Sequence, residues 1–438
     1  MKDKDLHDRL KDLTVRYMEL LRRSTSQRGG ALPQRLIPKI EFGLNGSMTI
    51  DKESKPDFGM LAATTLLDFV NDPSNEAIIK AVLENQSVVR LLKDKGVAIV
   101  PMAFAYNILQ PMITRQLVSQ NGIEMDEAEF DANYQAFEEY LDSEEDCYLF
   151  LAPLENFDME TESETVGPLT IRKLTAEEFA AFNGITAEPF SSASNFPFQP
   201  YRFVLEMKGA VKRGGPPLTQ TYQDRFWWLV AMMKLTKAGS VGYNTVWAQP
   251  LSWSGMSFGQ GSAYPRHTIL GKSVALRYQD LSRLRHYWEL VEPFVGRQTP
   301  FWMVALQRFC DAVDRHRPDE ALLDYWIACE SLFGEDIEIG ELTYRLSLRI
   351  AHFLGMSPVE RAKLRDDAKK AYHARGHLLH GARNLDHSKL AAQTLAIGEI
   401  TRRSLCKCVE EQYQSRDEMI RGIEASIMGK STGQDDLR

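Results

Sequence analysis

Hydrophobic positions change their spacing along the chain, and the changes predict three regions of different structure. Over 3–23, leucines recur at near-helical spacing among charged residues, which predicts an amphipathic helix, and the Ser- and Gly-containing stretch 24–31 predicts a linker. From there to about residue 280, short apolar runs alternate with turn signals, a pattern typical of mixed strands and helices. Beyond that point the spacing is helical throughout and strand signals vanish.

The mixed region contains several elements whose limits can be predicted. A strand is expected at 169–173, and Thr175 with Glu178 forms a capping box that predicts a helix directly after it. A second strand is expected at 201–207. The continuous bulky run 226–233 predicts a buried helix of the N-terminal region rather than an aromatic binding surface.

Six helices with short connections are predicted in the last third of the chain, which indicates a helical bundle. They are expected at 280–295, 301–316, 319–333, 341–354, 358–380 and 386–427. Ser357 as N-cap, Pro358 at the first helical position and Glu360 at the third define the start of the fifth helix. The expected fold class is an α+β N-terminal region followed by an all-α helical bundle. The expected domains are an N-terminal helix and linker over 1–31, a mixed α+β sensor or recognition region over 32–290, and a helical domain over 297–430.

The composition and the charge distribution narrow the class of protein. With 44% hydrophobic and 26% charged residues, the chain is neither collagen-like nor wholly disordered. The formal net charge is −8, but residues 116–171 hold many carboxylates and no Lys or Arg, so the remainder of the chain is basic overall. Such a distribution suits polyanion binding away from the acidic segment. The segment 124–164 is also a candidate electrostatic lid over a basic groove.

Nothing in the sequence predicts a membrane protein or a disulfide framework. The most apolar stretch, 96–113, contains two prolines and polar amides, so we expect it to be buried in the protein rather than to span a bilayer. The first 13 residues mix acids and bases, unlike a secretory signal. The 5 cysteines are scattered and include no CxxC pair. We therefore expect a cytoplasmic protein without a membrane partner.

Basic residues and one isolated glutamate mark the candidate chemistry of the helical region. Between 341 and 383 Lys and Arg outnumber Asp and Glu, so this stretch is basic. Glu330 continues an apolar helix face, where a carboxylate is costly unless it is paired, so it should meet a cation. The candidates are Arg345, Arg349 and Arg375, and the pair is either structural or part of a site.

A second pattern joins Arg375 to His380, five positions later. On a continuous helix these two side chains lie roughly 140° apart, so they do not stack, but they can border one groove near the helix end. Gly381 would let the chain leave the helix there. A permanent cation beside a group that titrates near pH ~6.5 provides the components for cleaving a phosphodiester.

At this point the sequence resembles a known family. Three blocks in order, 329–334 (CESLFG), 341–349 (ELTYRLSLR) and 371–381 (AYHARGHLLHG), resemble the ApeA-like branch of the HEPN domains over about 297–430. The resemblance implies an all-α HEPN bundle that often dimerises, with Arg and His of both copies facing one cleft. Many such domains are metal-independent endoribonucleases of anti-phage, abortive-infection defence.

The resemblance also assigns roles to residues of this chain. It implies that His380 is the general acid or base for attack by the ribose 2′-hydroxyl, and that Arg375 holds the scissile phosphate. The supporting groups would be Glu330, Arg345, Tyr372 and His377, and the RNA-binding residues would be Arg349 and Arg383. The implied partners are RNA, with tRNA as one candidate, a second copy of the chain and a phage-derived trigger, with no metal and no cofactor.

Several alternatives stay open. Gly376 stands where active members of the family usually carry a polar residue, so a non-catalytic HEPN module that binds RNA or a protein is the second interpretation. His373, His377 and His380 would share one helix face and could bind zinc, although no glutamate accompanies them as general base. The GxSxG match at 255–259 lacks the strand and helix that a nucleophile elbow needs.

Overall fold

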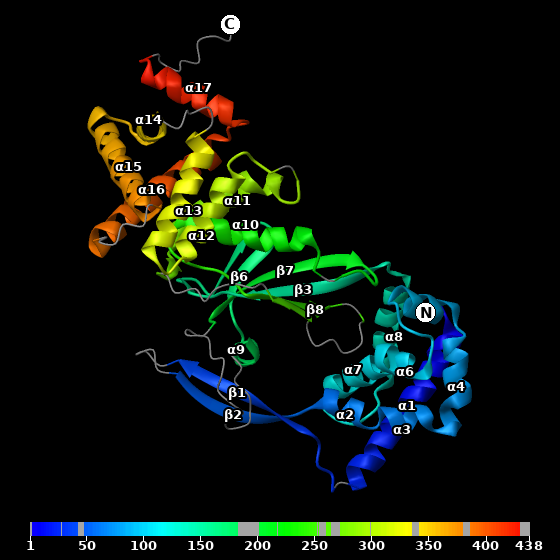
Figure 1. Ribbon diagram of the computed structural model, residues 1–438. Coiled ribbons are helices and arrows are strands. Elements are labelled where there is room, and N and C mark those ends of the chain that lie inside the picture. Colours follow the sequence, from blue (N-terminus) through cyan, green and yellow to red (C-terminus); the bar gives the residue numbers. More distant parts are fainter. Residues whose placement is uncertain are drawn as a thin grey trace.

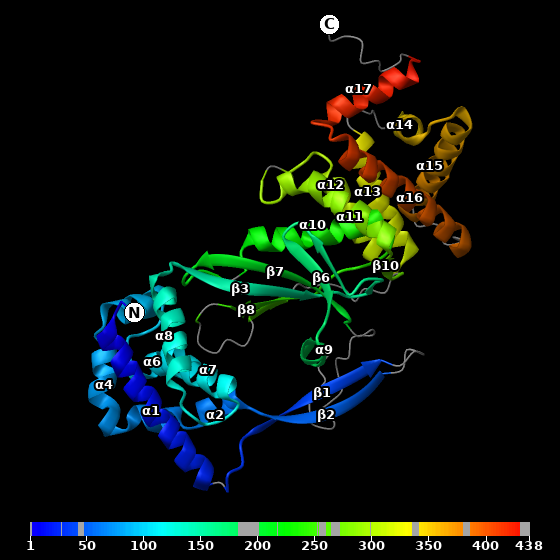
Figure 2. The ribbon, with the colours of Figure 1, turned by 180° about the vertical axis from the view of Figure 1, so that it is seen from behind.

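The computed structural model describes eleven stretches of the chain. They are residues 2–27, 29–42, 48–182, 201–216, 218–251, 253, 260–263, 272–297, 299–334, 341–379 and 386–429. Figures 1 and 2 show an N-terminal helical unit, a central antiparallel sheet and a C-terminal group of helices stacked on one face of that sheet. An α+β N-terminal part followed by helices is confirmed. None of the described helices is long and apolar enough to cross a bilayer.

The N-terminal helical unit has a hydrophobic core of its own. Its helices are α1 (Lys4–Gln27), α2 (Phe58–Thr64), α3 (Leu66–Asn71), α4 (Pro73–Leu83), α5 (Gln86–Asp94), α6 (Pro101–Phe104), a π-helical turn η1 (Ala105–Leu109), α7 (Gln110–Gln120) and α8 (Glu127–Asp142). The buried residues of this core include Leu6, Leu10, Leu13 and Leu21 of α1 and Ala105, Ile108 and Leu109 of η1. The expectation that the apolar stretch 96–113 is buried therefore holds mainly from Phe104 onward, whereas Ile99 and Val100 are exposed. Helix α1 packs with the helices that follow it.

A β-hairpin leaves this unit and ends beside the sheet. Strands β1 (Gln34–Phe42) and β2 (Met48–Pro56) pair antiparallel, with Gln34 opposite Pro56 and Phe42 opposite Met48. The hairpin lies on the side of the sheet that carries the short helix α9 (Ala176–Phe182), opposite the C-terminal helices (Figure 1). The capping box predicted for α9 is present, because Thr175 and Glu178 exchange backbone and side-chain hydrogen bonds of 2.9 and 3.2 Å.

The central sheet has six antiparallel strands in the order β5-β6-β7-β3-β8-β9. They are β3 (Glu145–Pro153), β5 (Ser163–Val166), β6 (Leu169–Lys173), β7 (Phe203–Lys212), β8 (Thr245–Pro250) and β9 (Gln260–Ala263). Strands β4 (Phe157–Met159) and β10 (Val274–Leu276) form a separate parallel pair. The longest pairing joins β3 to β7 and sets Phe150 opposite Met207. The predicted strand at 169–173 is β6, and the strand predicted at 201–207 belongs to β7.

Nine helical segments of the described residues follow β7, with β8 to β10 between the first and the second of them. They are α10 (Gln220–Thr236), α11 (Tyr278–Val291), the 3-10 turn η2 (Glu292–Phe294), α12 (Met303–Asp314), α13 (Pro318–Phe333), α14 (Leu342–Leu354), α15 (Pro358–Leu379), α16 (His387–Glu411) and α17 (Arg416–Ile427). The prediction of one helix over 386–427 is wrong, because Gln412 adopts a left-handed φ of 52° and Ser415 caps a new helix through the amide of Glu418. The Ser357 cap of α15 is present, at 3.2 Å from the amide of Glu360.

The hydrophobic cores divide the chain differently from the predicted boundaries. One apolar cluster runs without a break from Phe150 and Leu205 of the sheet, through α10, to Leu332 and Ile400 of the C-terminal helices. The helices after residue 297 therefore share their core with the sheet. The change from one core to the other falls between α8 and β3.

A buried lysine links the sheet layer to these helices. The Lys234 side chain on α10 is 1% exposed, and its Nζ lies 2.6 Å from Asp314 Oδ2 at the end of α12. Ser240 donates a hydrogen bond of 2.8 Å to the other oxygen of Asp314. A buried charge is tolerated only when it is paired, so this contact fixes how α12 lies on α10.

Candidate functional site

The isolated glutamate meets a cation, as its position predicted, and the cation is Arg375. Nη2 of Arg375 on α15 lies 3.1 Å from Oε1 of Glu330 on α13 and donates a hydrogen bond of 3.4 Å to Oε2. The two side chains are 22% and 26% exposed, so the pair lies at the edge of the core. Burial raises the pKa of Glu330, and the nearby guanidinium only partly offsets this effect.

One aromatic ring, that of Tyr372, also contacts Arg375. Cζ of Arg375 lies 5.4 Å from the centre of the Tyr372 ring, which in turn meets Trp326 of α13 edge to face at 5.1 Å. Within the described residues the guanidinium makes its ionic contact through Nη2 alone, toward Glu330. Since arginine carries five N–H donors, the others are left for an anionic ligand such as a phosphate.

The raised pKa of Glu330 predicts a pH signature in stability. An acid whose pKa is higher in the folded state stabilises the fold below its unfolded value, near 4.5, and this contribution is lost as pH rises through the folded value. Glu330→Gln removes the titration. We therefore expect the free energy of unfolding of the variant, relative to the parent, to increase between about pH 4 and about pH 7. Urea denaturation at a series of pH values measures this, with exposed Glu341→Gln as control, and a relative stability that falls with pH would contradict it.

Arg345 and Arg349 lie one turn apart on α14 but have different surroundings. Arg345 is exposed and pairs with Glu341 in its own first turn, at 2.7 Å. Arg349 is 7% exposed, donates a hydrogen bond of 2.7 Å to the Phe333 carbonyl at the end of α13, and lies 2.9 Å from Glu424 of α17. Neither arginine meets Glu330. The resemblance implied that Arg349 binds RNA. Its guanidinium instead contacts the end of α13 and Glu424 of α17, so we do not include Arg349 among the proposed RNA-binding residues.

Replacing these two arginines should therefore have unequal effects. Arg349→Met is expected to lower the free energy of unfolding by about 2 kcal/mol, because it removes charged hydrogen bonds from a buried carbonyl and a carboxylate. Arg345→Met removes an exposed pair within one helix and should cost less than about 0.5 kcal/mol. Chemical denaturation followed by circular dichroism compares them. Equal losses would show that Arg349 is not a structural contact.

The histidines of α15 face solvent. His373 and His377 are exposed, whereas His380 and Arg383 lie outside the described residues, which resume at Asp386. In the part of the chain that the structure describes, no three His, Cys, Asp or Glu side chains gather in a way that could hold a metal ion. The GxSxG match at 255–259 also lies outside the described residues.

Sequence reasoning missed an aromatic and basic cluster between α14 and α15. Tyr344 is 53% exposed, and its ring lies 4.9 Å from Cζ of Arg365 and 5.9 Å from Nζ of Lys369. Arg365, Lys369, His373 and His377 follow at intervals of four, so they form one ridge along α15. That spacing was visible in the sequence. The contribution of Tyr344 was not, because it depends on the packing of α14 on α15.

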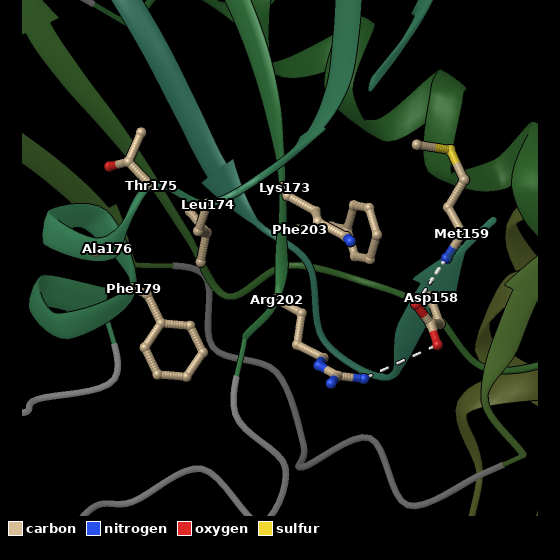
Figure 3. Close-up of a pocket in the computed structure, with 9 residues that line it drawn as sticks. All are labelled: Asp158, Met159, Lys173, Leu174, Thr175, Ala176, Phe179, Arg202 and Phe203. Carbon is tan, nitrogen blue, oxygen red and sulfur yellow. Dashed lines mark hydrogen bonds and ion pairs between the residues drawn. The ribbon is translucent and has the colours of Figure 1, made fainter. Parts of the chain in front are cut away.

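A cavity on the sheet, drawn in Figure 3, has no lining residue in α14 or α15 and so lies apart from this cluster. It is about 250 Å³ in volume and lies where β4, β6 and β7 meet the start of α9. Its two cations already face carboxylates, since Arg202 lies 4.0 Å from Asp158 and Lys173 lies 2.5 Å from Glu162. We assign no role to this cavity.

The acidic segment 124–164 does not cover the basic ridge. Its helix α8 packs among the N-terminal helices, at the opposite end of the molecule from α14 and α15 (Figures 1 and 2). The last part of the acidic segment contacts α11: Glu164 forms an ion pair with Arg285, and Glu160 accepts a hydrogen bond from the Tyr278 amide. The prediction of an electrostatic lid is therefore wrong for this structure.

Comparison with known proteins gives no further guide. No family model, no curated protein and no solved structure matches the chain.

Proposed function

We propose that the C-terminal helices form a HEPN-type domain that cleaves RNA without a metal ion, in bacterial anti-phage defence. The observation that supports this most is the partly exposed Arg375, held by Glu330 and Tyr372 on a helix that carries further basic side chains toward its end. A fixed cation whose remaining N–H groups make no ion pair with the described residues, beside a basic ridge, suits a phosphodiester. His380 follows the last described residue of α15 by one position.

The proposed reaction is an internal transesterification. His380 removes the proton of the ribose 2′-hydroxyl, the 2′ oxygen bonds to phosphorus, and the bond from phosphorus to the 5′ oxygen breaks. The leaving oxygen takes a proton from a histidine acting as general acid, and the products carry a 2′,3′-cyclic phosphate and a 5′-hydroxyl. Arg375 stabilises the added negative charge on the phosphate. A homodimer would supply a second Arg and His to the same cleft.

The cluster around Tyr344 supports binding of single-stranded RNA along α15. Tyr344→Ala should raise the Kd for a short single-stranded RNA about tenfold, because one stacked base contributes roughly 1–3 kcal/mol. Arg365→Gln should weaken binding and reduce the slope of log K against log salt by about 0.7, the value for one phosphate contact. Fluorescence anisotropy in chelator measures both. Tyr278→Ala, which removes an exposed tyrosine of α11, is the matched control and should leave the Kd unchanged.

Incubation of the full-length protein with tRNA and total RNA in chelator tests the proposed activity directly. We expect cleavage under these conditions, since no step uses a metal ion. Cleavage that requires an added divalent metal would contradict the mechanism and favour the histidine metal site.

RNA binding without cleavage would support the second interpretation, a non-catalytic HEPN module. Gly376 is the observation that favours it, because this position adds no polar side chain to the site. Addition of lysate from phage-infected cells separates that outcome from an inactive nuclease that waits for a phage-derived trigger.

A further inference from the structure

A second, larger cavity lies between the start of α10 and the segment that joins α11 to α12. It is about 590 Å³ in volume, which is within the usual range of small-molecule sites. Its walls come from α10, η2 and α12, together with Tyr243. None of its lining residues belongs to α13, α14 or α15, so it is separate from the Arg375 cluster.

One wall of the cavity is aromatic. Trp227 is half-buried and lines the cavity, whereas its neighbours in sequence, Phe226 and Trp228, are buried. The Trp228 ring packs edge to face against Trp227 at 5.4 Å and against Trp302 at 5.8 Å. These buried rings fix the position of the Trp227 ring in the cavity wall. The prediction of a buried helix at 226–233 is confirmed, but Trp227 is half-buried and faces the cavity, which the pattern did not indicate.

The side chains one helical turn before Trp227, on the same face of α10, are polar. Gln223 and Asp224 precede it by four and three positions, so all three share one face of the helix and line the same cavity. Gln220, in the first turn, donates a hydrogen bond of 2.7 Å to Asp224 Oδ1. A carboxylate oriented in this way beside an aromatic wall can accept hydrogen bonds from the hydroxyls of a sugar.

The opposite wall brings a cation to the amino end of α10. Gly296 has a φ of 68°, a conformation that favours glycine, and a Cβ placed on it would lie 3.6 Å from the Thr221 side chain. The next residue, Arg297, is exposed, lines the cavity and makes no ion pair within the described residues. The side chain of Thr219, the N-cap of α10, accepts no capping hydrogen bond from the first-turn amides. The positive helix end and the guanidinium together suit a phosphate.

We propose that this cavity binds a nucleotide, with the base stacked on Trp227, the ribose hydroxyls on Asp224 and the phosphate between Arg297 and the start of α10. The order of the three groups along the cavity follows the order of a nucleotide. The nucleotide is either free or the 5′-terminal unit of an RNA chain. The proposal does not depend on RNA cleavage at Arg375.

Isothermal titration of the full-length protein with AMP, CMP, adenosine and inorganic phosphate tests the site. We expect AMP to bind, and adenosine and phosphate each to bind at least about tenfold more weakly, because each lacks one set of contacts. Trp227→Ala should weaken AMP about tenfold or more through loss of stacking. Arg297→Gln should weaken AMP toward the affinity of adenosine and leave adenosine unchanged.

Matched variants control for indirect effects. Trp247→Ala removes an exposed tryptophan of β8, and Arg283→Gln removes an exposed arginine of α11; both should bind AMP as the parent does. Trp227→Phe keeps an aromatic ring in the cavity wall and should retain most of the affinity for AMP. It provides a second test of stacking in case Trp227→Ala does not fold. A 5′-phosphorylated trinucleotide that binds more tightly than AMP identifies an RNA end as the ligand, and the reverse identifies a free nucleotide. Failure of AMP and of the trinucleotide to bind at millimolar concentration would overturn the proposal. Binding of AMP by Trp227→Ala and Arg297→Gln as tight as by the controls, with no preference for AMP over adenosine, would also overturn it.

Discussion

Replacing Arg375 by alanine should lower the rate of RNA cleavage by at least ~10²-fold, and replacing His380 by alanine should do the same. The arginine stabilises charge that develops on the phosphate, and a positioned proton donor or acceptor typically contributes ~10²–10⁴-fold. Arg375→Lys should recover little activity, because an ammonium cannot keep the contact with Glu330 and also present a planar fork to the phosphate. Single-turnover cleavage of a labelled RNA in chelator measures these rates.

Two controls separate loss of chemistry from loss of charge or fold. Arg421→Ala removes an exposed arginine of α17, and His387→Ala removes an exposed histidine at the start of α16. Both should cleave at the parental rate. Unchanged cleavage by Arg375→Ala and His380→Ala would refute the assignment of the site, whatever the controls do.

Replacing Lys234 by methionine should lower the free energy of unfolding by about 3 kcal/mol, the largest effect on stability that we expect. The substitution leaves the Asp314 carboxylate beside the core without its cation, and removal of one partner of a buried pair costs about 3–5 kcal/mol. Because α10 and α12 share one core with the sheet, the loss should appear in the main unfolding transition. Urea denaturation followed by fluorescence measures it.

The matched control is Lys237→Met, one turn further along the chain. Lys237 is partly exposed, lies 3.3 Å from Asp280 and also contacts the Ala275 carbonyl, so its loss should cost less than about 1 kcal/mol. A similar small loss for Lys234→Met would show that the buried pair is not what fixes α12 on α10.

Much of the C-terminal half could be predicted because its signals are local. Helical spacing placed α11 to α15, and the Ser357 cap marks the start of α15 in both sequence and structure. The pairing of Glu330 with a cation could be predicted because an unpaired carboxylate on an apolar helix face is costly in any fold. The break at Gln412 could not be predicted, since neither glycine nor proline marks it and a glutamine took the left-handed conformation.

Contacts between segments that are far apart in the sequence could not be predicted from the pattern of hydrophobic and polar residues. Arg345 and Arg349 are four residues apart and lie on the same face of α14. Nevertheless, Arg345 is exposed to solvent, whereas Arg349 is buried against α13 and α17. Likewise, the sequence change near residue 280 marks a change in secondary structure rather than a boundary between cores. Whether the helices share a core with the sheet depends on which apolar faces meet.

The most direct test of the central claim is cleavage, in chelator, of an RNA oligonucleotide with a single 2′-deoxy substitution on the 5′ side of a mapped cut. The proposed mechanism makes the 2′-hydroxyl the nucleophile, so the substituted bond should stay intact while the unmodified RNA yields 2′,3′-cyclic phosphate and 5′-hydroxyl ends. Cleavage at the deoxy position, or products with 3′-hydroxyl and 5′-phosphate ends, would contradict it.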